Sequence, residues 1–134
     1  MGDIGIERTG LVALIELVRV LGPNPDLRGA EGIGRLVAQL HTLRRMSVSV
    51  AGMLQAGKEP VVEGSIVKDL GTIWEQKLPA RVRELAAFVE PETTNRVTLE
   101  EQLAFATTIA PKLTLQGGTT EVLRGIIARG LGLR

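Results

Sequence analysis

Apolar residues recur at intervals of three and four along almost the whole chain of 134 residues, which is the period of an α-helix with one buried face. Nowhere do apolar and polar residues alternate strongly enough to predict a β-strand, and there is no internal repeat. We therefore expect an all-α fold: an up-and-down antiparallel helical bundle of four long segments plus a short C-terminal helix. Because this length is close to the commonest domain size, residues 1–134 are expected to form one domain.

Proline and glycine divide the pattern into five expected helices. These helices cover residues 7–21, 27–56, 63–89, 99–110 and 119–129. Asp26 is expected to cap the second helix with its side-chain oxygen, and Gly57 to end that helix in the left-handed conformation. Pro79 lies inside the third expected helix and should bend it.

Side-chain chemistry sets the expected limits of the fourth helix. The stretch EPETTNRV, residues 90–97, is typical of a loop. Thr98 and Glu101 are spaced as in a capping box, in which each side chain bonds to the other's backbone, so the helix should begin at Leu99. Pro111 should end it, because proline cannot continue the hydrogen-bond ladder.

The expected core is aliphatic, because the chain has one Trp, two Phe and no Tyr. In the first helix the predicted buried stripe consists of Leu11, Leu14, Ile15, Val18 and Leu21. Trp74 falls on the apolar stripe of the third helix and should be a core residue. His41 stands alone and is interpreted as an ordinary packed or surface side chain.

Composition excludes several classes of function. There is no Cys, which rules out disulfides and thiolate metal sites, and no other metal-ligand pattern is present. Sixteen basic and fifteen acidic residues nearly balance, so we expect no nucleic-acid partner. No apolar run approaches the ~20 residues of a membrane span, and the N-terminus lacks a signal-peptide pattern. A cytoplasmic protein with no membrane partner is therefore expected.

The most unusual stretch is GGTTE, residues 117–121, immediately before the last expected helix. A helix N-terminus carries free N–H groups and partial positive charge, and glycines let a ligand approach the backbone closely. The stretch therefore suits a phosphate, a carbonyl or the oxygen-rich edge of a cofactor. The structural alternative is a tight turn followed by an ordinary N-cap at Thr119. A helical anion-binding module built on Gly118 and Thr119 is a further possibility.

The longer stretch QGGTTEVLRGIIARGLGLR, residues 116–134, resembles the C-terminal signature of acyl-CoA dehydrogenases. The positions that match are Gly118, Thr119, Glu121, Arg124, Ile126, Ile127, Ala128, Leu131, Gly132 and Leu133. IERTGL, residues 6–11, and EGSIVKDLGTIWEQKL, residues 63–78, resemble two further helices of the same family. The resemblance covers only the family's C-terminal helical domain, without its N-terminal helical domain or its middle β-domain.

The resemblance implies a flavoenzyme that oxidises an acyl-CoA to the 2,3-enoyl-CoA, with FAD as cofactor and an electron-transfer acceptor and acyl-CoA as partners. It implies that Gly118 approaches the thioester of the substrate, and that Thr119 and Glu121 approach the flavin. The family's Arg-x-x-Phe-Gly flavin contact is not recognisable in this sequence, and Arg28 and Arg35 are the candidates to replace it.

One branch of the family carries the catalytic base just before the Gly-Thr of the signature, but Gly117 occupies that position and has no side chain. A second branch carries the base in a Glu-Arg pair on the first helix of the domain, which Glu7 and Arg8 match. Glu7 is therefore the candidate base. The alternative is that Glu7 only stabilises the helix N-terminus, by about 0.3–1 kcal/mol.

Two roles follow for the chain. As part of a dehydrogenase it would supply part of the FAD and acyl-CoA site, and alone it should be inactive and should not retain FAD. As a non-catalytic assembly module it would form the core of a homo-oligomer, because apolar surface left uncovered favours self-association.

Overall fold

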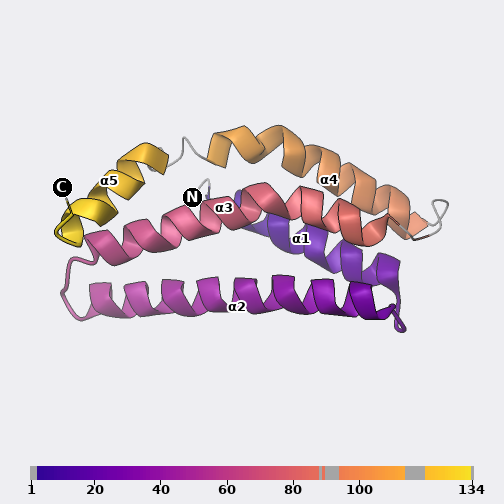
Figure 1. Cartoon of the computed structure of the whole chain (residues 1–134), viewed down its shortest axis with the longest axis horizontal. Helices are drawn as coiled ribbons and strands as arrows, with labels where there is room; N and C mark the ends of the chain where they lie inside the picture. Colours follow the sequence, from indigo (N-terminus) through magenta and orange to yellow (C-terminus); the bar gives the residue numbers. More distant parts are fainter. Residues whose placement is uncertain (1–2, 88, 90–93, 114–119, 134) are drawn as a thin grey trace.

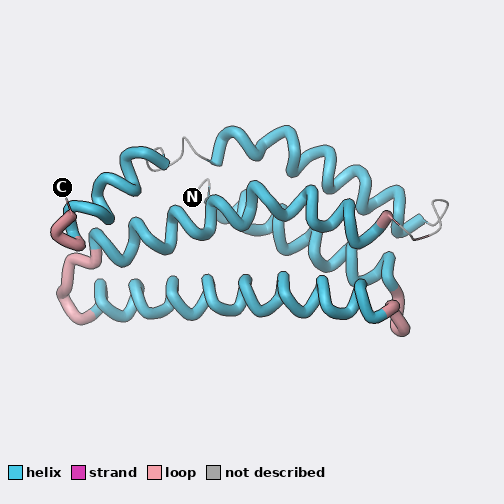
Figure 2. The backbone as a smooth tube through the Cα atoms, in the orientation of Figure 1, coloured by secondary structure: helices cyan, strands magenta, loops and turns pink. Residues whose placement is uncertain are grey.

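A computed structural model describes the backbone of residues 3–87, 89, 94–113 and 120–133, and the side chains of these residues except 3–9, 94 and 110–113. The described residues form five helices and no strand, so the predicted all-α bundle is confirmed (Figures 1 and 2). The helices are α1 (Asp3–Leu21), α2 (Leu27–Gln55), α3 (Val61–Ala86), α4 (Thr94–Leu113) and α5 (Thr120–Gly130). None of the described helices combines the length and the apolar content that crossing a membrane requires.

Helix α3 is the centre of the bundle, because α1, α2, α4 and α5 all pack against it. Figure 1 shows α4 and α5 in tandem along one side of α3, with α2 along the opposite side. The C-terminal half of α3 is surrounded by α1, α2 and α4, and we call this part of the molecule the four-helix end. The N-terminal half of α3 contacts α2 and α5, and we call this part the three-helix end.

The aliphatic core lies at the four-helix end. Its largest fully buried side chains are Leu17 of α1, Leu78 and Val82 of α3, and Leu99 and Leu103 of α4. Trp74 is also buried, as predicted. Three helices therefore converge on one cluster, and α2 adds to it mainly through Leu36.

The buried face of α1 differs from the predicted stripe. Leu14 is buried, but Leu11, Ile15 and Val18 are 40%, 42% and 45% exposed. The face that packs inward instead carries Gly10, Ala13, Leu14 and Leu17. Gly10 leaves room for the Glu75 carboxylate of α3, which a Cβ at that position would meet. The prediction is confirmed for Leu14 and for Leu21, which packs partly buried against the core, and is wrong for the other three because it followed only the large apolar residues.

Both predicted boundaries of α2 are confirmed. The Asp26 side chain accepts a hydrogen bond from the backbone N–H of Gly29 over 2.7 Å. Gly57 follows the helix at φ +77°, and the backbone N–H of Lys58 donates to the Met53 carbonyl over 3.0 Å. Only glycine adopts that φ without strain, so the turn after α2 depends on Gly57. Pro79 is buried inside α3, which continues through it.

The predicted limits of α4 are wrong at both ends. The helix begins at Thr94, so Thr98 is already in helical backbone and cannot form the capping box, which needs a non-helical first residue. It also continues past Pro111 to Leu113. The expected loop over residues 90–97 is therefore helical from residue 94, and residues 90–93 lie outside the described part.

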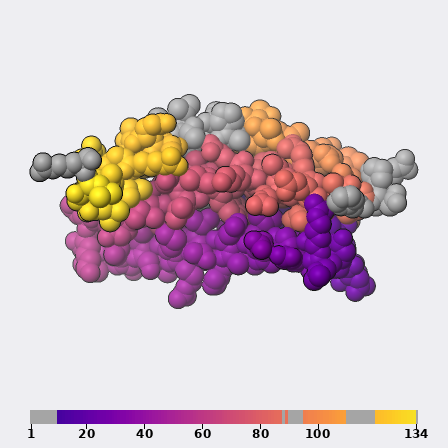
Figure 3. Space-filling view, in the orientation of Figure 1, coloured from indigo at the N-terminus to yellow at the C-terminus, as the bar shows by residue number. Residues whose placement is uncertain are grey.

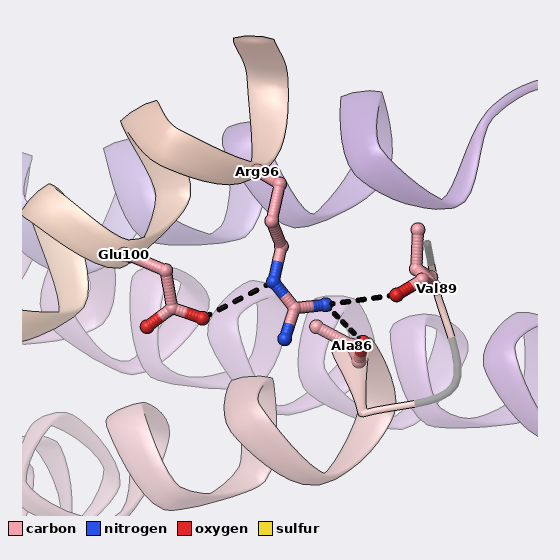
Figure 4. A network of polar contacts seen from close by, with 4 residues as sticks. All are labelled: Ala86, Val89, Arg96 and Glu100. Atoms are coloured by element: carbon pink, nitrogen blue, oxygen red, sulfur yellow. Dashed lines mark hydrogen bonds and ion pairs between the residues drawn. The ribbon is translucent and has the colours of Figure 1, made fainter. Parts of the chain in front are cut away.

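Arg96 shows what holds the start of α4 in place (Figure 4). Its Nη1 donates to the carbonyls of Ala86 and Val89 at the C-terminus of α3, and its Nε pairs with the Glu100 carboxylate over 3.1 Å. The guanidinium adds donors to these carbonyls, of which that of Ala86 also accepts from the backbone N–H of Val89 over 3.1 Å. Apolar periodicity in the sequence cannot predict this contact, because it joins a charged side chain to backbone carbonyls.

Candidate functional site

The three-helix end buries polar side chains. Ser65, Asp69 and Thr72 of α3 are 8%, 9% and 9% exposed, and their spacing of four and three places them on one face of the helix. Ser65 satisfies its hydroxyl by donating to the Val61 carbonyl over 2.7 Å. Buried polar groups are costly without partners, so this face is the first candidate for a site.

Helix α5 is fixed on α3 in an antiparallel register. Gly130 lies against Val62, so closely that a Cβ there would collide with the valine side chain. Arg124 pairs with Asp69 nearer the middle of α3. Leu123, 6% exposed, is the buried apolar anchor of α5. This register directs the N-terminus of α5, with the backbone N–H groups of its first turn, toward the middle of α3.

The Asp69–Arg124 pair is the main electrostatic link between the two helices. Arg124 Nε lies 3.5 Å from Asp69 Oδ2, and the arginine side chain is 62% exposed whereas the aspartate side chain is 13% exposed. The other carboxylate oxygen, Asp69 Oδ1, is buried and has no hydrogen-bond partner in the described part of the chain. Arg124 therefore balances the charge of Asp69 without satisfying the whole carboxylate.

Three residues were predicted to bind cofactor or substrate: Gly118, Thr119 and Glu121. The structure describes only Glu121 among them. It lies in the first turn of α5 with its side chain exposed. Gly118 and Thr119, like Gly117, lie outside the described residues. Helix α5 begins at Thr120, one residue later than expected, directly after this glycine-containing stretch.

Glu7, the predicted base, lies on α1, and its side chain is outside the described part. Three residues further on, Gly10 packs against Glu75 in the middle of α3. The segment that carries Glu7 and the beginning of α5 therefore lie at a similar level along α3. No described residue of α1 contacts α5.

The two arginines considered as replacements for a flavin contact are exposed on α2 and have partners within the four-helix end. Arg28 donates to the Glu84 carbonyl over 3.0 Å, and Arg35 pairs with Glu31 over 3.1 Å. The described residues include no group of His, Asp or Glu side chains that could hold a metal ion. His41 is exposed on α2.

Asp69 was not predicted as a site residue, and Arg124 was noted only as a match to the terminal signature. Ser65, Asp69 and Thr72 repeat at helical spacing beside the apolar stripe of the same helix, a pattern that is typical of a solvent-exposed face. Nothing in the sequence therefore indicates that Asp69 is buried.

Comparison with known proteins finds no matching family model, no matching curated protein and no matching solved structure.

Proposed function

We propose that this chain is the C-terminal helical domain of a flavin-dependent acyl-CoA dehydrogenase, and that it contributes part of the FAD and acyl-CoA site. The terminal signature carries the proposal. Its residues from Glu121 to Ala128 lie on α5, and one of them, Arg124, pairs with Asp69 and holds the helix in its register.

The beginning of α5 supplies the geometry that supports this proposal. The first backbone N–H groups of a helix have no partner within it and carry partial positive charge, which suits an oxygen-rich group. Glu121 is exposed there and can contact a ligand brought by another domain. The described residues thus fit one edge of a cofactor. They do not form an enclosed flavin pocket, so the chain alone should be inactive and should bind FAD weakly or not at all.

In the proposed reaction the carboxylate of Glu7 removes the α-proton of the acyl-CoA. The α-proton becomes acidic when backbone donors polarise the thioester carbonyl, and we assign this role to Gly118. Bound FAD would accept the hydride from the β-carbon, which leaves the 2,3-enoyl-CoA. A water-poor site would raise the affinity of Glu7 for the proton.

The test is a measurement on the longest protein that contains this chain. That protein should purify with flavin absorbance and reduce an artificial electron acceptor only when an acyl-CoA is present. Glu7→Gln should lower kcat by about 10²–10⁴-fold while the flavin is retained, because it keeps the shape and removes proton acceptance. Glu63→Gln makes the same change at an exposed position of α3 and should have no effect. A protein without flavin and without acyl-CoA-dependent reduction would refute the proposal.

A non-catalytic assembly module is the second candidate function. It is favoured by the exposed apolar side chains of Leu11, Ile15 and Val18, which follow one another along one flank of α1. Ile15→Glu should then lower the mass of the chain in sedimentation equilibrium, whereas Val48→Glu, at a 68% exposed position of α2, should not. A chain that is monomeric before substitution excludes this role.

A further inference from the structure

A groove of about 470 Å³ lies between α2 and α3. The surfaces of these two helices run alongside each other across the face shown in Figure 3. The walls of the groove are mainly apolar and include Leu36, Leu43, Met46, Ile73, Trp74 and Leu78. No residue of α1 or α5 lines the groove, so it is separate from the site proposed above.

The dimensions of the groove favour a slender ligand. Its lining residues span positions 36–46 of α2 and 70–81 of α3, which is about 16 Å at the helical rise of 1.5 Å per residue. Its volume falls within the roughly 300–1,000 Å³ of pockets that hold small molecules. A partner helix, about 10–12 Å across with its side chains, would rest on the rim instead.

The charge at the rim is positive. Lys77 and Arg81, one turn apart on α3, line the groove, and no acidic residue does. Lys77 has no ion-pair partner in the described part of the chain. Arg81 has a long contact of 3.9 Å to Glu84, and both side chains are exposed, so that contact holds it weakly. The opposite rim offers the neutral polar residues Gln39 and Thr42.

Two neighbouring cations suit a phosphate better than a carboxylate. A phosphate monoester has three acceptor oxygens and a charge of about −1.5 to −2 at neutral pH, so it can use both cations. Trp74 also lines the groove, and its indole N–H is buried. The chain has one tryptophan, so the fluorescence of Trp74 reports directly on the wall of the groove.

We propose that the groove between α2 and α3 binds a single-chain alkyl phosphate. Its aliphatic chain lies along the apolar walls of the two helices, and its phosphate lies between Lys77 and Arg81. The inference does not depend on the dehydrogenase proposal, because neither Glu7 nor the beginning of α5 takes part in it.

The test is a fluorescence titration of the chain with dodecyl phosphate, kept below the concentration at which it forms micelles. A saturable change in Trp74 emission with one site per chain is expected. Dodecanol and dodecyltrimethylammonium, which have the same alkyl chain with a neutral or cationic head, should bind at least about tenfold more weakly.

The charge variant is Lys77→Gln with Arg81→Gln, and it should weaken dodecyl phosphate binding about three- to tenfold and leave dodecanol unchanged. The matched control is Arg45→Gln with Lys58→Gln, which removes the same charge at exposed positions outside the groove and should bind like the parent. Circular dichroism checks that both variants keep the parent helicity. Equal binding of dodecanol and dodecyl phosphate would overturn the inference, as would a charge variant that binds like the control. A parent chain that is dimeric, with Trp74 emission that follows dimer dissociation, would instead assign the groove to a second copy.

Discussion

The two halves of α3 bury different chemistry. The C-terminal half places Leu78, Val82 and Ala86 among aliphatic side chains of α1 and α4. The N-terminal half buries Ser65 and Asp69 beneath α5. Aliphatic burial stabilises a fold in proportion to the area removed from water, whereas buried polar groups do little more than offset their own desolvation. The four-helix end should therefore carry most of the stability, and α5 should open at a lower free energy.

The same contrast bears on the proposed function. Segments that contact ligands are commonly drawn from the less stable parts of a fold, because they adapt when the ligand binds. The signature residues of α5 lie at the three-helix end, where Leu123 and the Asp69–Arg124 pair hold the helix. Substitutions at each end test this division.

Leu17→Ala should lower the free energy of unfolding by about 2–5 kcal/mol, because it leaves a cavity at a fully buried position. Urea denaturation followed by circular dichroism measures the change. Leu54→Ala, at a 61% exposed position of α2, should stay within about 0.5 kcal/mol of the parent. A loss below 1 kcal/mol for Leu17→Ala would mean that the four-helix end is not the main source of stability.

Arg96→Met should lower stability by about 1–3 kcal/mol, since it removes hydrogen bonds from a charged group to carbonyls at the end of α3. The side chain of Arg96 is 18% exposed, so water replaces those bonds poorly. Arg35→Met breaks an exposed pair of the same spacing on α2 and should cost no more than about 0.5 kcal/mol. Similar losses for both variants, in the same denaturation experiment, would contradict the capping role of Arg96.

Asp26→Ala should cost about 1 kcal/mol, because it removes the side-chain acceptor for the N–H of Gly29. Asp26→Asn keeps an acceptor oxygen and should be close to the parent. Thermal unfolding of the three proteins at one pH compares them directly. If Asn is as destabilising as Ala, the negative charge of Asp26 matters more than its hydrogen bond.

Arg124→Gln should have the smallest global effect, below about 1 kcal/mol, because the arginine is 62% exposed and its pair with Asp69 is screened by solvent. Its effect should be local: amide hydrogen exchange should become faster in α5 and stay unchanged in α1 and α4. Faster exchange in all helices would show that the two ends unfold as one unit.

The sequence was sufficient to predict the fold class, the number of helices and the limits of α2, because these follow from periodicity, from Asp26 and from Gly57. It failed in part for α1, where the inward face consists of Gly10 and Ala13 as well as leucines. Small residues carry little apolar signal, so the pattern of large apolar residues does not include them. It failed for α4 because Arg96 stabilises the helix start through carbonyls of α3, which no local pattern encodes.

For the candidate site, the sequence predicted a helix from Thr119, and the described helix begins one residue later. It also named Glu121 as a residue near the flavin, which stays a prediction. It did not predict the partner of Arg124, since residues 69 and 124 meet only when α5 packs on α3. The groove between α2 and α3 was also beyond sequence reasoning, because it depends on how far apart two helices lie.

Since α1, α2, α4 and α5 all rest on α3, this helix sets the orientation of one end of the molecule relative to the other. One residue inserted between Asp69 and Trp74 would turn the two halves of α3 by about 100° relative to each other, at 3.6 residues per turn. Helix α5 would move around the axis of α3 and no longer lie in line with α4, and α2, which packs against both halves, could not follow both of them. The number of residues between Asp69 and Trp74 is therefore constrained by the packing of α4 and α5 on α3.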